Sequence, residues 1–211
     1  MNPTTVAIGG FSSEVGKTTL MCHLLRAFPG WEAIKLTRGH YRSCGKDPHA
    51  CCVSHLLGDA PIVRSGRGQT YAPGKDTGRY WDAGASNVHW VIVTESQVGQ
   101  GIRQALERVR APGVLIEGNS FLSFIEVDFA LMVARPGVGK IKASARKALG
   151  KTSALFVCED GEGAVTTHEA LSAWRRDPAL RDPIDALPVY TSDELPQLIA
   201  RLEEVRRKTC R

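Results

Sequence analysis

A glycine- and hydroxyl-rich stretch near the start of the chain is the first feature that points to chemistry. Residues 10–19 read GFSSEVGKTT, which follows the pattern G-x-x-x-x-G-K-[ST] except that five residues rather than four separate Gly10 from Gly16. In this pattern the glycines let backbone N–H groups point at phosphate oxygens, the lysine reaches the β and γ phosphates, and the hydroxyl group ligates Mg²⁺. We therefore expect a nucleotide-phosphate site formed by Gly10, Ser12, Ser13, Glu14, Val15, Gly16, Lys17, Thr18 and Thr19.

Two charged residues further along the chain could complete such a site. Glu117 ends the apolar run VLIE, and Lys35 lies in the run WEAIKL. The carboxyl ends of parallel strands meet at one edge of a sheet, where ligands bind. Glu117 is therefore predicted to hold Mg²⁺ together with Thr18, the alternative being a solvated glutamate at a strand end. For Lys35 two interpretations remain open: a contact to the γ phosphate or to an acidic substrate, or an ordinary surface lysine.

A second stretch is rich in the residue types that bind zinc. Residues 39–58 read GHYRSCGKDPHACCVSHLLG, and they offer nitrogen and sulfur ligands of the kind Zn²⁺ prefers. The candidate ligands are Cys44, Cys51, Cys52 and His55. A closed structural zinc site that stiffens a long loop is one interpretation. The other is a set of ordinary small buried cysteines and loop histidines.

The elements that would position these residues follow from the hydrophobic pattern. Short apolar runs alternate with segments of helical period along the chain, which predicts an α/β fold with a mostly parallel sheet and helices on both faces. The run TVAIGG before the phosphate motif and the segment KTTLMCHLLRAF after it read as a strand and a helix. This is the context the motif requires, and a chance glycine turn would not need it. Residues 38–78 show no sustained period, so we expect a long loop or lid there.

Composition sets the outer limits of the interpretation. The 211 residues suit a single domain, 1–211, with the Cys/His-rich insertion at about 38–78. A net charge of +5, without a Lys/Arg tract that interleaves aromatics, does not favour nucleic acid as a partner. No apolar run approaches the ~20 residues of a membrane span, and the first residues do not read as a signal peptide. We therefore expect a cytoplasmic protein that does not act in a membrane, with its cysteines outside a disulfide framework.

The motifs together resemble a known branch of phosphate-loop proteins. SSEVGKTTL, Lys35 and VLIEG resemble the class that includes dethiobiotin synthetase and the molybdopterin-guanine dinucleotide biosynthesis protein B family. GKDTGRYWDAGAS, residues 74–86, is similar to a Gly-Lys-Asp-Ser/Thr, Arg, Ala-Gly-Ala pattern of the latter family. The resemblance implies a P-loop NTPase fold, a homodimer, a molybdopterin nucleotidyltransferase as partner, and a second site that includes Lys75, Asp76 and Arg79.

The resemblance also leaves choices open. The guanine-reading pattern N-K-x-D is absent, so GTP and ATP both remain candidates. The first hypothesis is an accessory protein of molybdenum cofactor biosynthesis that binds and hydrolyses a nucleoside triphosphate. Lys17 would stabilise the transferring phosphoryl group, and Asp76 would assist the Mg²⁺ held by Thr18 and Glu117. The alternative is a kinase or acid-activating enzyme of the dethiobiotin synthetase type, with Lys35 and Arg79 on a small acidic acceptor. A third hypothesis is a metal or cofactor carrier without enzymatic activity, in which the bound nucleotide switches the lid.

Overall fold

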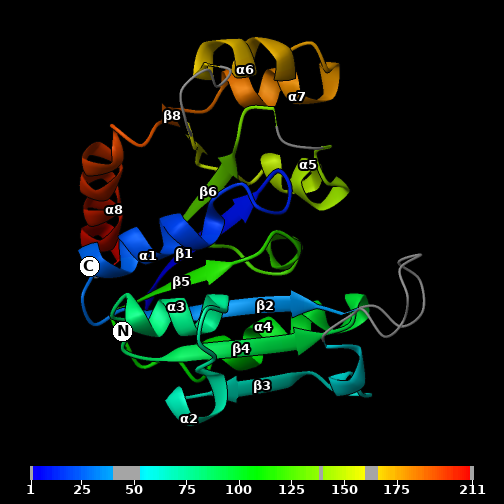
Figure 1. Ribbon diagram of the computed structural model, residues 1–211, viewed down its shortest axis with the longest axis vertical. Helices are drawn as coiled ribbons and strands as arrows, with labels where there is room; N and C mark the ends of the chain where they lie inside the picture. Colours follow the sequence, from blue (N-terminus) through cyan, green and yellow to red (C-terminus); the bar gives the residue numbers. More distant parts are fainter. Residues whose placement is uncertain (1, 40–52, 138–139, 160–165, 210–211) are drawn as a thin grey trace.

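The computed structural model describes residues 2–39, 53–137, 140–159 and 166–209 of the chain (Figure 1). The strands are β1 (Thr4–Gly10), β2 (Glu32–Arg38), β3 (Ile62–Ser65), β4 (Val88–Val93), β5 (Gly113–Glu117), β6 (Phe129–Ala134), β7 (Ala154–Val157) and β8 (Val189–Tyr190). The α-helices are α1 (Lys17–Ala27), α2 (Arg67–Thr70), α3 (Asp76–Asp82), α4 (Val98–Leu106), α5 (Ala143–Leu149), α6 (Thr167–Trp174), α7 (Pro178–Asp185) and α8 (Leu195–Thr209). Short 3₁₀ turns are η2 (Ser54–Leu56), η3 (Glu95–Gln97) and η4 (Ser120–Ser123).

All eight strands join one sheet in the order β3-β4-β2-β5-β1-β6-β7-β8. Every neighbouring pair is parallel except β3 and β4, which are antiparallel. The α/β fold with a mostly parallel sheet is therefore confirmed. The phosphate motif follows β1, which lies between β5 and β6 in the interior of the sheet.

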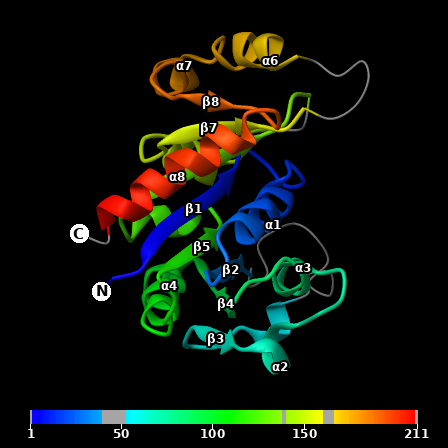
Figure 2. The same cartoon turned by 90° about the vertical axis from the view of Figure 1, so that its left-hand side faces the viewer.

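Successive side chains along a strand point alternately into two cores, which lie on opposite faces of the sheet. Val6 and Ile8 of β1 point into a core shared with α1, α3 and α8, whereas Ala7 points into a core shared with α4, α5 and α7. Figure 2 shows α3 and α4 on opposite sides of β2 and β4. Because both faces are covered, the central strands are apolar along their length. Polar side chains concentrate where those strands end.

The region expected to be a loop contains regular elements in its described part. Residues 62–65 form β3, a four-residue strand at the edge of the sheet, and residues 67–70 form α2. The first residues of α3, which begins at Asp76, also fall within the expected loop. The structure contains no helix, within the ranges it describes, that is long and apolar enough to cross a membrane.

Candidate functional site

The phosphate motif forms a tight loop between β1 and α1, as its spacing predicts. Two of its residues have positive φ: Glu14 at 60° and Gly16 at 98°. A Cβ atom at Gly16 would lie 2.5 Å from Sγ of Cys158, so glycine is required there for space as well as for conformation. α1 begins at Lys17, and no described side chain caps its first turn. Its N–H groups and the positive end of its dipole are thus available to an anion.

An asparagine after β5 fixes the beginning of the loop. The Gly10 N–H donates to Oδ1 of Asn119 at 2.8 Å, and Nδ2 of Asn119 donates back to the Gly10 carbonyl at 2.9 Å. The two bonds join the end of β1 to the segment that follows β5, across 109 positions of sequence. Asn119 was not among the expected site residues. A polar side chain two positions after Glu117 at a strand end was the only sequence signal for it.

A cavity of about 600 Å³ opens beside the loop at the carboxyl edge of the sheet. Of the expected residues, Val15 is buried in the core and Lys75 is exposed, and neither lines the cavity. The cavity is lined by the expected Gly10, Ser12, Ser13, Glu14, Gly16, Lys17, Thr18, Thr19, Lys35, Asp76, Arg79 and Glu117, and also by Leu36, Arg38, Gly118, Asn119, Ser120, Arg135, Lys142 and Ser144. The basic side chains Lys17, Lys35, Arg38, Arg79, Arg135 and Lys142 outnumber the acidic Glu14, Asp76 and Glu117. The cavity is therefore suited to a polyanion.

Lys35 lies at the centre of a charged cluster in this cavity. Its Nζ is 2.6 Å from Oε1 of Glu117 and 2.7 Å from Oδ2 of Asp76. Lys35 and Glu117 are direct neighbours across β2 and β5, so their side chains leave the same face of the sheet. The Lys35 side chain is 19% exposed and that of Glu117 only 4%. Lys35 is thus an ion-paired, largely buried group rather than an ordinary surface lysine.

The oxygen atoms around Lys35 are hard donors of the type Mg²⁺ prefers. Oγ1 of Thr18 donates to Oδ1 of Asp76 at 2.9 Å, which brings the motif hydroxyl to the same carboxylate. A hydroxyl and two carboxylates thus converge on one position that a cation, the Lys35 ammonium, already neighbours. Mg²⁺ is commonly bound by one or two carboxylates together with phosphate oxygens and water. The residues present therefore fit this ion.

Burial and neighbouring charges shift the pKa values of Lys35, Asp76 and Lys17. Burial lowers the pKa of Lys35, but the carboxylates of Glu117 and Asp76 outweigh it, and the pKa stands above its usual value. Burial raises the pKa of Asp76, but Lys35 and the Thr18 hydroxyl bring it below its usual value. Burial lowers the pKa of Lys17, whose Nζ donates to the Ser12 carbonyl at 3.0 Å. The ion pair between Lys35 and Asp76 is accordingly charged at neutral pH.

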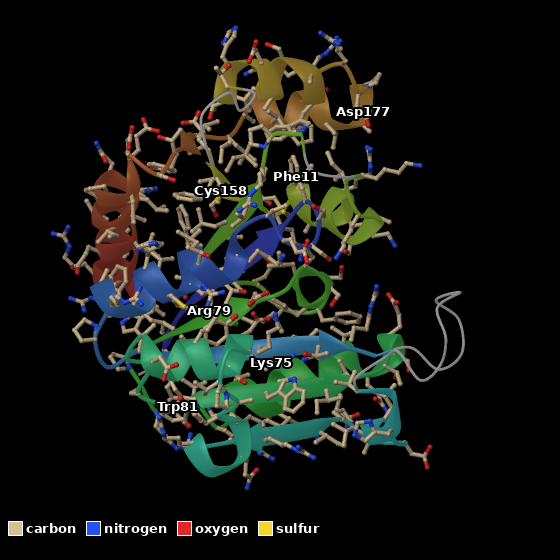
Figure 3. All side chains as sticks on the ribbon, viewed as in Figure 1. Phe11, Lys75, Arg79, Trp81, Cys158 and Asp177 are labelled. Carbon is tan, nitrogen blue, oxygen red and sulfur yellow. The ribbon has the colours of Figure 1, made fainter. Side chains whose placement is uncertain are left out.

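Two basic residues border the loop from the other side. Nζ of Lys142 donates to Oγ of Ser13 at 2.8 Å, and Arg135, directly after β6, lies beside Gly16. Both residues follow the buried strand β6 in the sequence. On the opposite side of the cavity, a guanidinium nitrogen of Arg79 lies 3.4 Å from Oγ1 of Thr19. Figure 3 labels Arg79 on the side of α3 that faces α1, and Phe11 and Cys158 near the loop.

The zinc hypothesis falls mostly outside the described residues. Cys44, Cys51 and Cys52 lie within residues 40–52, which the structure does not describe. His55 is described and is exposed. Within the described ranges, no group of three or more His, Cys, Asp or Glu side chains is arranged to hold a metal ion. The Mg²⁺ fit above differs, because it uses two carboxylates and one hydroxyl.

Comparisons with known proteins give matches among solved structures alone. No family model matches it, and no curated protein matches its sequence. Among solved structures, LpxK from Aquifex aeolicus in complex with ATP is similar, with 14% identity and a TM-score of 0.48, over 90% of this chain and 54% of that one. The Zn(II)-bound YjiA GTPase from E. coli is similar, with 16% identity and a TM-score of 0.40, over 90% of this chain and 58% of that one. The chain spans just over half the length of these proteins, and the likeness concerns the arrangement of the chain alone.

Proposed function

We propose that the protein binds a nucleoside triphosphate with Mg²⁺ and hydrolyses or transfers its γ phosphate. The observation that carries this is the convergence of the phosphate loop, the α1 N-terminus and the Lys35–Asp76–Glu117 cluster on one cationic cavity. The loop N–H groups and Lys17 would hold the β and γ phosphates. Thr18, Asp76 and Glu117 would hold the metal ion, which neutralises phosphate charge when bound.

Lys35 supplies the second positive charge at the γ-phosphate position. In the ligand-free protein its ammonium is shared between Asp76 and Glu117. If those carboxylates held a metal ion, the ammonium of Lys35 would be free to contact a phosphate oxygen in the same cavity. Charge stabilisation of this kind, by groups already in place, is the main catalytic resource in phosphoryl transfer.

Substitution of the loop lysine tests the proposal. Lys17→Ala should abolish binding of fluorescent ATP and GTP analogues and Mg²⁺-dependent phosphate release. Lys151→Ala, which removes an exposed lysine paired with Glu126, is the control and should bind as the wild type does. A Lys17→Ala protein that keeps both binding and turnover would overturn the proposal.

A second candidate function is phosphoryl transfer to a small acidic acceptor. The cavity extends past the loop to Arg38 and Arg79, which add cationic side chains beyond those that the phosphates would need. An arginine there can hold a carboxylate or phosphate bidentately. Phosphate release without any acceptor supports hydrolysis. A phosphorylated product that forms only with an added acid, and is lost in Arg79→Ala, supports the kinase.

The molybdenum cofactor role rests on motif similarity and is the finer part of the proposal. The stretch 74–86, which carries that similarity, supplies Asp76 and Arg79 to the cavity. A pull-down against a molybdopterin nucleotidyltransferase, with and without nucleotide, tests this role. If no complex forms either with or without nucleotide, the molybdenum cofactor role is wrong. The proposed binding and hydrolysis of nucleotide would not be affected.

A further inference from the structure

A fully buried tyrosine contacts the charged cluster on the side away from the cavity. Tyr80 lies on α3 with 0% of its surface exposed, and its hydroxyl donates to Oε2 of Glu117. Glu117 lines the cavity, but Tyr80 is not among the residues that line it. The tyrosine therefore acts on the carboxylate and does not reach a ligand in the cavity.

The hydrogen bond determines which oxygen of Glu117 faces the cavity. Oε2 is held by Tyr80, and Oε1 is 2.6 Å from Nζ of Lys35. A carboxylate free to rotate could present either oxygen, or lie between the two positions. With one oxygen held by a buried donor, the other is directed at the position where Lys35 and the proposed metal ion compete.

One short helix thereby controls both carboxylates of the cluster. Asp76 and Tyr80 are separated by one turn of α3, so they share a face of the helix. Asp76 meets Lys35 directly, and Tyr80 acts through Glu117. The distance between the two carboxylates thus depends on where α3 docks.

The docking of α3 is itself closely defined. A Cβ atom at Gly78 would lie 2.0 Å from the Ala72 carbonyl oxygen, so only glycine permits the approach. Nε1 of Trp81 donates to Oγ1 of Thr70 at 2.8 Å, which fixes the helix to α2. A rigidly held helix can impose a precise position on Glu117 through a single hydroxyl.

We propose that Tyr80 is a positioning residue that orients Glu117 for the divalent cation of the nucleotide site. This inference rests on the proposed function, because it concerns the same cation. Removing the hydroxyl should weaken cation binding and leave the contacts of the loop with phosphate unchanged. A merely structural tyrosine would affect stability without this selective effect.

The test compares Tyr80→Phe with the wild type in two titrations. Mn²⁺ is titrated into protein saturated with a non-hydrolysable ATP or GTP analogue, whichever the wild type binds, and is followed by electron paramagnetic resonance. The same analogue is titrated in fluorescent form without metal, in EDTA. We expect Mn²⁺ affinity to fall about 10- to 100-fold and metal-free nucleotide affinity to change less than about two-fold.

Two further variants separate positioning from packing. Tyr190→Phe, a hydroxyl deletion on the distant strand β8, is the matched control and should leave both affinities unchanged. In a Glu117→Ala background, Tyr80→Phe should cause no additional loss of Mn²⁺ affinity, since the group it orients is gone. A further loss there would mean that Tyr80 acts through packing and would overturn the proposal.

If Tyr80→Phe does not fold, Glu117→Asp tests the same hydrogen bond by changing its acceptor. The shorter side chain cannot reach Tyr80 and Lys35 at once, so Mn²⁺ affinity should fall although the tyrosine is intact. Unchanged Mn²⁺ affinity in a folded Tyr80→Phe or Glu117→Asp protein would contradict the inference. Failure of the wild type to bind either nucleotide would instead contradict the proposed function.

Discussion

At the scale of single residues, the position of Lys35 depends on strand register. The sequence predicted that Lys35 and Glu117 would lie at the same edge of the sheet, because both belong to the later part of an apolar run. It did not predict that they are direct neighbours, since the two residues are 82 positions apart and register between such strands is set by the packing of the whole sheet. The role of Tyr80 could not be predicted from the sequence for a related reason. A tyrosine in a helix segment is most often a core residue, and only the fold brings its hydroxyl to Glu117.

The charge on Lys35 leads to a prediction about metal binding without nucleotide. Lys35→Met leaves Asp76 and Glu117 without their shared cation, and a divalent ion can then replace it. Mg²⁺ or Mn²⁺ at about 100 times its dissociation constant would stabilise the variant by about 2.7 kcal/mol. Thermal melting with and without the ion should show a rise of several degrees in the variant and a smaller one in the wild type.

Lys142→Met is the control for that experiment. Lys142 lines the same cavity but bonds Ser13, on the side away from the two carboxylates. Its loss removes one positive charge without exposing a metal position. If Lys35→Met responds to the ion no more than Lys142→Met does, Lys35 does not compete with the metal.

The glycine that precedes α1 gives a second prediction at this scale. Gly16→Ala places a side chain on a residue with φ of 98° and drives its Cβ into Sγ of Cys158. We expect a loss of about 1–3 kcal/mol in the free energy of unfolding and no detectable nucleotide binding. Gly150→Ala, where a Cβ would meet nothing within 4 Å, should melt and bind as the wild type does.

At the scale of elements, strands with a strong hydrophobic pattern could be predicted from the sequence, and strands with a weak pattern could not. The central strands are buried on both faces, so their apolar runs identified them. β3 is four residues long and half-buried throughout, and it is stabilised by antiparallel pairing with β4. Such a strand carries no distinctive pattern of its own, which is why residues 38–78 were expected to be loop. The first turn of α3 was included in that loop because glycine disfavours a helix, yet Gly78 is needed for the close approach to Ala72.

A network of hydrogen bonds joins several of these elements near the start of β2, away from the cavity. Oε2 of Glu32, at the start of β2, is 2.6 Å from Nε2 of His89 on β4, and Oγ of Ser65 on β3 is 2.8 Å from Nδ1 of the same ring. Oε1 of Glu32 accepts from the N–H groups of Arg110 and Ala111 before β5. One carboxylate therefore joins β2 to β4 and to the segment before β5, and His89 extends the chain to β3.

The pKa of Glu32 makes this junction dependent on pH. Burial raises that pKa, but the bonds from His89, Arg110 and Ala111 outweigh burial and lower it overall. A depressed carboxyl pKa gives stability that is present above the unfolded value of 4.5 and is lost as the pH falls through the folded value. Glu32→Gln should therefore cost about 2 kcal/mol at pH 7, and the difference from the wild type should shrink below about pH 4.5. Urea unfolding of both proteins at pH 7 and below about pH 4.5 measures this difference in stability. A difference that stays constant with pH would contradict the stabilising role given to ionised Glu32.

At the scale of the whole molecule, the phosphate loop contributes to the cores on both faces of the sheet, Val15 to one and Phe11 to the other. α6 and α7 lie together at the end of the sheet that carries β8 (Figure 1). The ring of Trp174, the last residue of α6, meets the ring of Phe11 edge-on, with centroids 5.0 Å apart. Phe11 belongs to the phosphate loop. Its N–H donates to the Val133 carbonyl at 2.9 Å, and its own carbonyl accepts from the Lys142 N–H at 2.8 Å.

This contact predicts that a residue outside the cavity influences nucleotide affinity. Trp174→Ala removes the packing that holds the Phe11 ring, and the loop backbone on either side of that ring must then be ordered by the nucleotide itself. We expect a loss of about 2 kcal/mol in the free energy of unfolding, since Trp174 is half-buried, and nucleotide affinity about three- to ten-fold weaker. Leu202→Ala on α8 is the control, because it destabilises the core on the opposite face of the sheet, which does not include Phe11 or Trp174. Calorimetric titration of both variants at a temperature where each is folded decides the matter: equal affinity losses would reflect global destabilisation, whereas a loss confined to Trp174→Ala shows that α6 supports the phosphate loop.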